Sequence, residues 1–185
     1  MNTLKIILLA IVCAVGLRAQ AQDTNSLRTE IGLFESRSGV VLIKAFGAVG
    51  SIPLGSANLS VGYKQTKDLS SGEKVYGLIV EIEGDNFGHA SALLDDDELD
   101  STINAVNYLA KITSNVTSLG GFEASYTTKS SLQIIADCVR KDGGIQDYVQ
   151  IAEYPRIRLS SVQLTQLYAL LLEGRKNLDS IKSAK

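Results

Sequence analysis

The chain has few of the residues that build disulfides and metal sites. Its 185 residues include two cysteines and one histidine. We expect the first cysteine, Cys13, to leave with an N-terminal segment, so that Cys138 remains alone and no intramolecular disulfide forms. Because zinc sites are built from several Cys and His ligands, these counts exclude cysteine-rich zinc sites and sites with two histidines. Burial of apolar surface must therefore hold the fold together.

Motifs of common catalytic chemistry are also absent. The sequence contains no Gly-x-Ser-x-Gly nucleophile elbow and no Gly-x-x-x-x-Gly-Lys phosphate-binding loop. The single histidine, His89, follows the polar stretch GDNFG, where a solvated side chain is the simpler interpretation than a general base. We therefore expect a protein that is not an enzyme and that needs no cofactor.

The N-terminus has the layout of a secretory signal peptide. Lys5 precedes an apolar run from Ile6 to Leu17, and Ala19-Gln20-Ala21 provides a small-residue cleavage site. The run of about 12 residues is shorter than the roughly 20 that a helix needs to cross a bilayer. The sequence predicts a signal peptide over residues 1–21, export to the periplasm or the extracellular space, and no transmembrane anchor after cleavage. A retained membrane anchor is the alternative.

Cleavage would leave residues 22–185, which we expect to form a single domain. Lys5 and Arg18 would be lost, so the formal net charge would change from −2 to −4. A mildly acidic chain lacks the basic surface that is typical of nucleic-acid-binding proteins. It also lacks a polybasic cluster that would attract it to a membrane surface.

Two stretches of the sequence have the pattern of β-strands. The first holds GVVLIKAFGAV, ANLSVGYKQT and KVYGLIVEIEG, which indicate β-structure from residue 31 to residue 84, and a short strand, SALL, follows after a loop. The second holds GFEASYTTK, SLQIIADCVR, IQDYVQIAEY and RIRL. Alternation in SLQIIADCVR predicts that Cys138 is a small buried hydrophobe on the strand face of Ile134 and Ala136, rather than a thiol that pairs with another chain. Glycines inside the first stretch predict bulges or strong bends at Gly47, Gly62 and Gly77.

An amphipathic helix is predicted after each run of strands. Apolar residues recur at spacings of three and four from Leu94 to about Thr113, and again after Ser160. Gly174 predicts a kink or an early stop in the second helix. The sequence thus predicts an α+β fold that repeats one unit, an antiparallel β-meander followed by an α-helix, over about 30–117 and 120–185. Two sheets and two helices would surround one core.

Acidic residues are concentrated at the start of the first predicted helix. A metal site is one interpretation, with Asp95, Asp97 and Glu98 as weak candidate ligands, but an EF-hand loop needs alternating ligands and a glycine at its sixth position. The start of a helix is the favoured interpretation. An uncharged counterpart, Ser160 with Gln163, has the same spacing, and both pairs match capping boxes with a hydrophobic staple. The acidic segment comprises Asp95, Asp96, Asp97, Glu98 and Asp100.

The order of meander, helix, meander and helix resembles the Whirly fold, which also describes the single-stranded-DNA-binding domain of a eukaryotic transcriptional coactivator. The closest local match is RIRLSSVQLTQLYALL, residues 156–171, which is similar to the last strand and the Ser-capped helix of that group. Plant Whirly proteins carry KGKAAL where this chain has IKAFGAV, with Lys44 as its one cation. The resemblance therefore implies a fold and carries over no binding residue.

One part of the sequence combines cations with tyrosines. Single-stranded nucleic acid is bound by such combinations, because bases stack on the rings and cations follow the phosphates. Tyrosine is also common in strands, and acidic residues interleave with these cations. We expect an exported, non-catalytic binding or structural protein whose partner is an unknown protein or a second copy, joined through an exposed sheet edge. Single-stranded nucleic-acid binding is the alternative, and its candidate face comprises Arg140, Lys141, Tyr148, Tyr154, Arg156 and Arg158.

Overall fold

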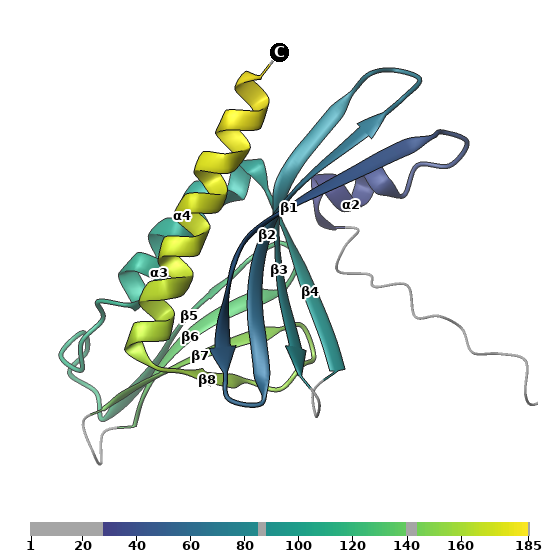
Figure 1. Cartoon of the computed structure of the whole chain (residues 1–185). Helices are drawn as coiled ribbons and strands as arrows, with labels where there is room; N and C mark the ends of the chain where they lie inside the picture. Colours follow the sequence, from purple (N-terminus) through teal and green to yellow (C-terminus); the bar gives the residue numbers. More distant parts are fainter. Residues whose placement is uncertain (1–27, 85–87, 140–143, 185) are drawn as a thin grey trace, which may run out of the picture.

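Two four-stranded antiparallel sheets, each followed by a helix, form the protein (Figure 1). The computed structural model describes residues 28–84, 88–139 and 144–184. Strand order is β1-β2-β3-β4 in the first sheet and β5-β6-β7-β8 in the second, so each sheet is a meander of sequential strands. The predicted α+β class, with two meanders each followed by a helix, is confirmed. The predicted signal peptide lies outside the described residues.

The first sheet is built from long strands that alternate between a buried and a more exposed face. Leu59, Val61, Leu78 and Val80 are buried on its inner face, as expected where β-branched and leucine side chains alternate with polar ones. Its strands are β1 (Leu42–Leu54), β2 (Ala57–Asp68), β3 (Lys74–Gly84) and β4 (Gly88–Asp95).

The second sheet is shorter and contributes its inner face to the same core. Ile134, Ala136 and Cys138 are buried at alternating positions of one strand, so the prediction for the thiol is confirmed. The strands are β5 (Gly121–Thr127), β6 (Leu132–Val139), β7 (Ile145–Ile151) and β8 (Ile157–Leu159).

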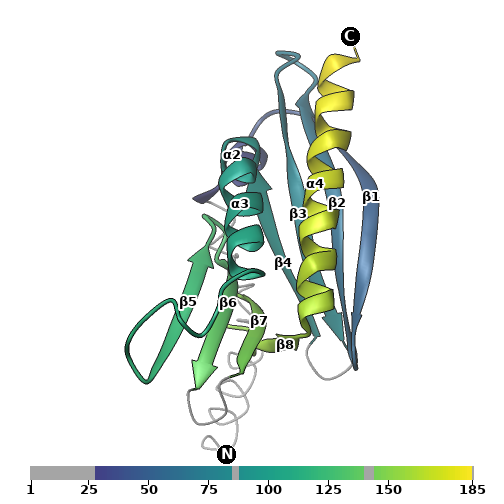
Figure 2. The same cartoon turned by 90° about the vertical axis from the view of Figure 1, so that its left-hand side faces the viewer.

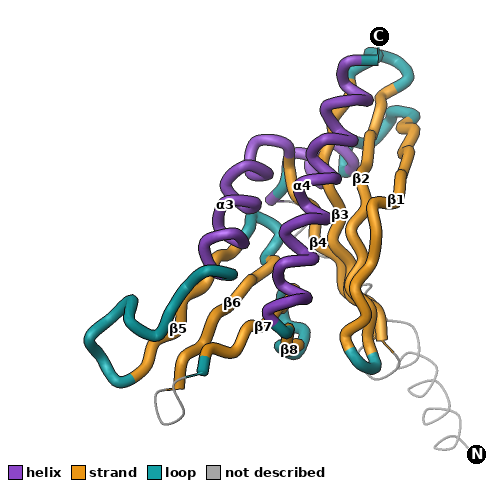
Figure 3. The backbone as a smooth tube through the Cα atoms, turned by 60° about the vertical axis from the view of Figure 1, so that its left-hand side comes forward, coloured by secondary structure: helices purple, strands orange, loops and turns teal. Residues whose placement is uncertain are grey.

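Each helix packs mainly against the sheet of the other half. The helix α3 (Leu99–Leu109) follows the first sheet but contacts β5 and β6 of the second. The helix α4 (Ser161–Ser183) follows the second sheet and contacts β1, β2 and β3 of the first. The two helices lie side by side (Figures 1 and 2), with α3 next to the second sheet and α4 next to the first (Figure 3). One cluster of buried apolar residues therefore includes both halves of the chain.

A short helix, α2 (Glu30–Glu35), corrects the expectation that β-structure begins at residue 31. Thr29 caps it, because its Oγ1 accepts a hydrogen bond from the Gly32 amide at 3.0 Å. Ile31 and Phe34 pack with Val75 of β3 in a small second cluster. Six residues are too few to show a helical period in the sequence, since one stripe needs about 11 residues or more to be recognised.

Glycines in the strands and in α4 mark places where side chains approach the backbone. The β2–β3 and β3–β4 ladders run through Gly77 without a register shift, so a bulge there is wrong, and a bend there stays a prediction. Gly62 pairs with Ala48 of β1, next to Gly47, where the β1–β2 ladder is irregular. A shift does occur in β1, between Ala48 and Gly50. A methyl group at Gly47 would overlap the ring of Tyr63, with 2.0 Å to the nearest ring atom.

The predicted kink or early stop at Gly174 is wrong, because α4 continues to Ser183. Gly174 is buried, and a Cβ atom there would lie 2.9 Å from both Cδ atoms of Leu78. Leu78 is itself fully buried in β3. This glycine therefore lets α4 approach the first sheet closely.

Replacing Gly174 by alanine is expected to destabilise the protein. Alanine gains about 1 kcal/mol of helix propensity, whereas overpacking a core costs about 1–3 kcal/mol. We expect a net loss of about 1 kcal/mol in the free energy of unfolding, measured by urea denaturation. With Leu78→Ala in the background, the same change should become stabilising, because space for the methyl group is then present. Equal losses in the two backgrounds would contradict close packing at this position.

Candidate functional site

The acidic segment lies where the two halves of the fold meet, and Asp95 is its buried member. Asp95 Oδ2 accepts a hydrogen bond from the Glu30 amide at 2.7 Å, and Oδ1 accepts one from the Ile31 amide at 3.2 Å. These amides belong to the first turn of α2, where a negative charge is favourable. Lys129, between β5 and β6, adds an ion pair at 3.2 Å from its Nζ to Oδ2. One carboxylate thus joins α2, the end of β4 and the second sheet.

The other acidic side chains of this segment also have partners in the protein. Asp97 pairs with Lys129 at 2.6 Å. Glu98 accepts hydrogen bonds from the backbone amides of Asp95 at 3.1 Å and Lys129 at 3.0 Å. Arg175 of α4 lies 3.2 Å from Asp96 and 3.8 Å from Asp100, and Lys182 also pairs with Asp96. The segment therefore holds the second sheet and the C-terminal helix in place.

The prediction that these acids begin a helix is confirmed. A single 3-10 turn, Asp96–Glu98, leads directly into α3. Capping boxes are present at Asp95 with Glu98 and at Ser160 with Gln163. In the first box the Asp95 carboxylate is directed mainly at α2, whereas the Ser160 hydroxyl caps its own helix. Among the described residues, no group of three or more His, Cys, Asp or Glu side chains is arranged to hold a metal ion.

Burial and hydrogen bonding alter the acid–base properties of this segment. Burial raises the pKa of the Glu98 carboxyl group, and the hydrogen bonds from the backbone of Lys129 and Asp95 offset this effect only in part. The hydrogen bond to Asp97 is the main cause of a raised pKa at Lys129, which favours its charged form. The ammonium group therefore stays available as the partner of both aspartates.

Asp95 and Asp97 form a matched pair for mutation, because Lys129 contacts both. Their side chains are 0% and 67% exposed. Asp95→Asn should lower the free energy of unfolding by about 2–3 kcal/mol, since it removes charge-assisted hydrogen bonds in a buried setting. Asp97→Asn should cost less than about 1 kcal/mol, as is usual for an exposed ion pair.

Urea denaturation measures both losses, and hydrogen exchange locates them. In the Asp95→Asn variant, the backbone amides of Glu30 and Ile31 should exchange their hydrogens faster than in the parent protein. In the Asp97→Asn variant, their exchange rates should be unchanged. Equal losses in the two variants would show that Asp95 does not have the role described.

The structure brings together part of the tyrosine- and arginine-containing face predicted from the sequence. Tyr148 of β7 and Arg158 of β8 lie directly opposite each other. Arg156 instead pairs with Glu123 at 2.8 Å, and the Tyr154 hydroxyl donates to the backbone carbonyl of His89. Arg140 and Lys141 lie outside the described residues. The His89 ring is largely exposed, and its Nε2 lies 3.3 Å from Glu81.

Sequence reasoning did not single out Asp147, which is 8% exposed on the inner side of β7. Within the described part of the chain, its Oδ1 is the buried side-chain polar atom that lacks a hydrogen-bond partner. Burial raises the pKa of this carboxyl group. A signal was present in the sequence, because Asp147 shares the alternating positions of Ile145, Val149 and Ile151.

Replacing Asp147 by asparagine should remove one contribution to the pH dependence of stability. The raised pKa means that the folded state favours the protonated acid, so the free energy of unfolding falls as pH rises above the ordinary value of 3.8 and through the folded-state pKa. Asp147→Asn should therefore be more stable than the parent at pH 7, by about 1–2 kcal/mol. At pH 3 this advantage should disappear. Glu98 titrates in both proteins and cancels in the difference, so an equal effect of the mutation at the two pH values would contradict the prediction.

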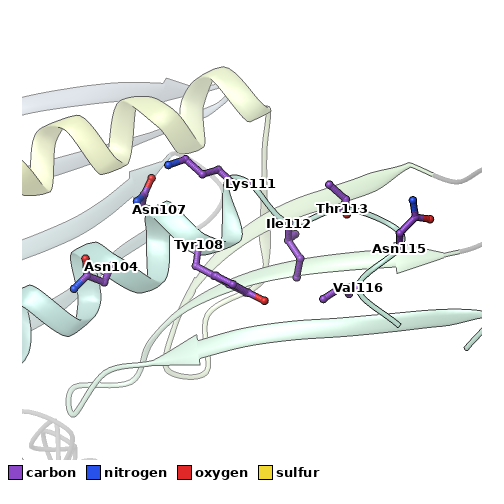
Figure 4. A pocket seen from close by; sticks show the side chains of 8 residues that line it. All are labelled: Asn104, Asn107, Tyr108, Lys111, Ile112, Thr113, Asn115 and Val116. Carbon is purple, nitrogen blue, oxygen red and sulfur yellow. The ribbon is translucent and has the colours of Figure 1, made fainter. Parts of the chain in front are cut away.

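A second surface that sequence reasoning missed is a hollow of about 400 Å³ at the C-terminal end of α3 (Figure 4). Asn104, Asn107 and Lys111 follow one face of the helix and the turn after it, at spacings of three and four. Such a stripe in a sequence is indistinguishable from an ordinary solvated helix face. We call this surface the amide hollow, and its lining residues are Asn104, Asn107, Tyr108, Lys111, Ile112, Thr113, Asn115 and Val116.

Polar side chains of the amide hollow are not engaged by the rest of the described protein. Neither the three asparagine side chains nor Lys111 makes a hydrogen bond or an ion pair with another described residue. Tyr108 is 62% exposed, and its ring extends from α3 toward the loop that carries Val116 (Figure 4). Whereas the acidic segment is fully paired within the protein, this surface has polar groups available to a ligand.

Comparison with protein-family models, with curated proteins and with solved structures gave no match. The resemblance to the Whirly fold therefore stays a prediction from the sequence. None of the helices in the described ranges combines the length and the apolar character that crossing a membrane requires.

Proposed function

We propose that this is an exported, non-catalytic structural or binding protein that self-associates through the outer edge of β1. The observation that carries the proposal is the unpaired edge of this strand. β1 ends the strand order of the first sheet, and no described strand pairs with its outer edge (Figure 3). Unpaired backbone amides and carbonyls on such an edge can pair with a strand of another chain.

The exposed half of β1 lacks the features that usually protect a sheet edge. Lys44 is the one charged residue between Val41 and Ile52, and its Nζ is paired with Glu35 at 2.7 Å. The register shift between Ala48 and Gly50 lies at the middle of the strand, and Pro53 lies at its far end. Apolar side chains are exposed here, with Phe46 at 65%. Edges of this kind favour association between chains.

A second copy of this chain fits the edge because antiparallel pairing about Phe46 places no like charges opposite each other. In that register the Phe46 rings of the two copies face each other, and an aromatic pair contributes about 0.5–1.5 kcal/mol. Lys44 lies opposite Ala48 of the second copy. The result is a continuous eight-stranded sheet with twofold symmetry.

Charge changes at Ala48 test this register. Ala48→Glu places a carboxylate opposite Lys44 of the second copy and should strengthen the dimer. Ala48→Lys places two ammonium groups opposite each other and should weaken it. Because the pair occurs twice, each dissociation constant should change by about fivefold or more. Sedimentation velocity over a concentration series measures these changes.

Val162→Glu and Val162→Lys serve as controls, because Val162 is 65% exposed and belongs to α4 rather than to the half of β1 that forms the proposed interface. They should leave the dissociation constant unchanged. A parent protein that remains monomeric at all concentrations would overturn the proposal. A dimer that responds in the same way to both charges at Ala48 would overturn the register.

A further inference from the structure

We infer that the amide hollow binds an acidic saccharide, a sugar ring that carries a carboxylate. Three asparagine side chains line the hollow, and each offers both a hydrogen-bond acceptor and donors. Each sugar hydroxyl is likewise both a donor and an acceptor. Neutral amides can therefore bond to a polyhydroxylated ligand in either direction, without the desolvation cost of burying a charge.

Apolar atoms of the hollow suit the C–H face of a pyranose ring. Tyr108 and Val116 are among the exposed large apolar side chains of the protein, and Ile112 lies between them in the chain. A flat aromatic ring beside polar amides provides one surface for C–H groups and another for hydroxyl groups. The volume of about 400 Å³ is that of a small-molecule site.

Lys111 sets the preferred charge of the ligand. It is the one ionisable cation among the eight lining residues, and none of them is acidic. The hollow therefore carries one positive charge and no negative charge. One exposed ammonium group suits a single carboxylate, whereas a nucleic-acid strand needs several cations along its phosphates.

Titration of the full ¹⁵N-labelled chain with galacturonate, which carries one carboxylate, tests the inference, with its methyl ester as the uncharged comparator. NMR signals from the side-chain amides of Asn104, Asn107 and Asn115 should shift, with weak, millimolar binding. The acid should bind several-fold more tightly than the ester. If neither saccharide shifts the signals of these amides, the inference is overturned.

Variants separate the roles of the ring and the cation. Tyr108→Ala should abolish the shifts, because it removes the stacking surface. Lys111→Gln should make the acid and the ester bind equally, whereas Lys176→Gln, an exposed lysine of α4, should keep their difference. Binding that survives Tyr108→Ala, or an acid preference that survives Lys111→Gln, would overturn the assignment, as would shifts at these amides that a short oligonucleotide reproduces.

Discussion

The buried carboxylate of Asp95 imposes a constraint that several elements of the structure satisfy together. A charge removed from water costs several kcal/mol unless ion pairs and hydrogen bonds replace its hydration. Two amides of α2 and the ammonium group of Lys129 supply that replacement here. Burial of Asp95 at the end of β4 is therefore favourable only when α2 has formed and the second sheet is packed in place. The surrounding acids extend the same linkage to α4 through Arg175 and Lys182.

Apolar packing also links the two halves, because each helix packs against the sheet of the other half. α3 covers β5 and β6, and α4 covers β1 to β3, so each half completes the core of the other. Surfaces outside that core are left for other roles. The edge of β1 and the amide hollow lie on different elements, so association and ligand binding need not compete.

Local patterns predicted most of this fold, because they report short-range physics. Alternation located the strands, and the capping boxes at Asp95 and Ser160 located both helix starts. Features that depend on tertiary contacts could not be predicted from such local patterns. Gly174 suggests a helix break until Leu78 is known to pack on it, and the helical start of residues 30–35 depends partly on a carboxylate 65 positions away. The amide hollow is polar and therefore resembles any exposed helix face in the sequence.

The sequence separation between the first sheet and α4 has a consequence for synthesis. The face of β1 to β3 that α4 covers stays open until this 23-residue helix has been made, more than 60 residues after β4 ends. Contacts this distant in sequence form slowly, and an uncovered apolar sheet accepts any matching helix. If two newly made chains exchanged their α4 helices, the product would be a domain-swapped pair with the same core as the monomer.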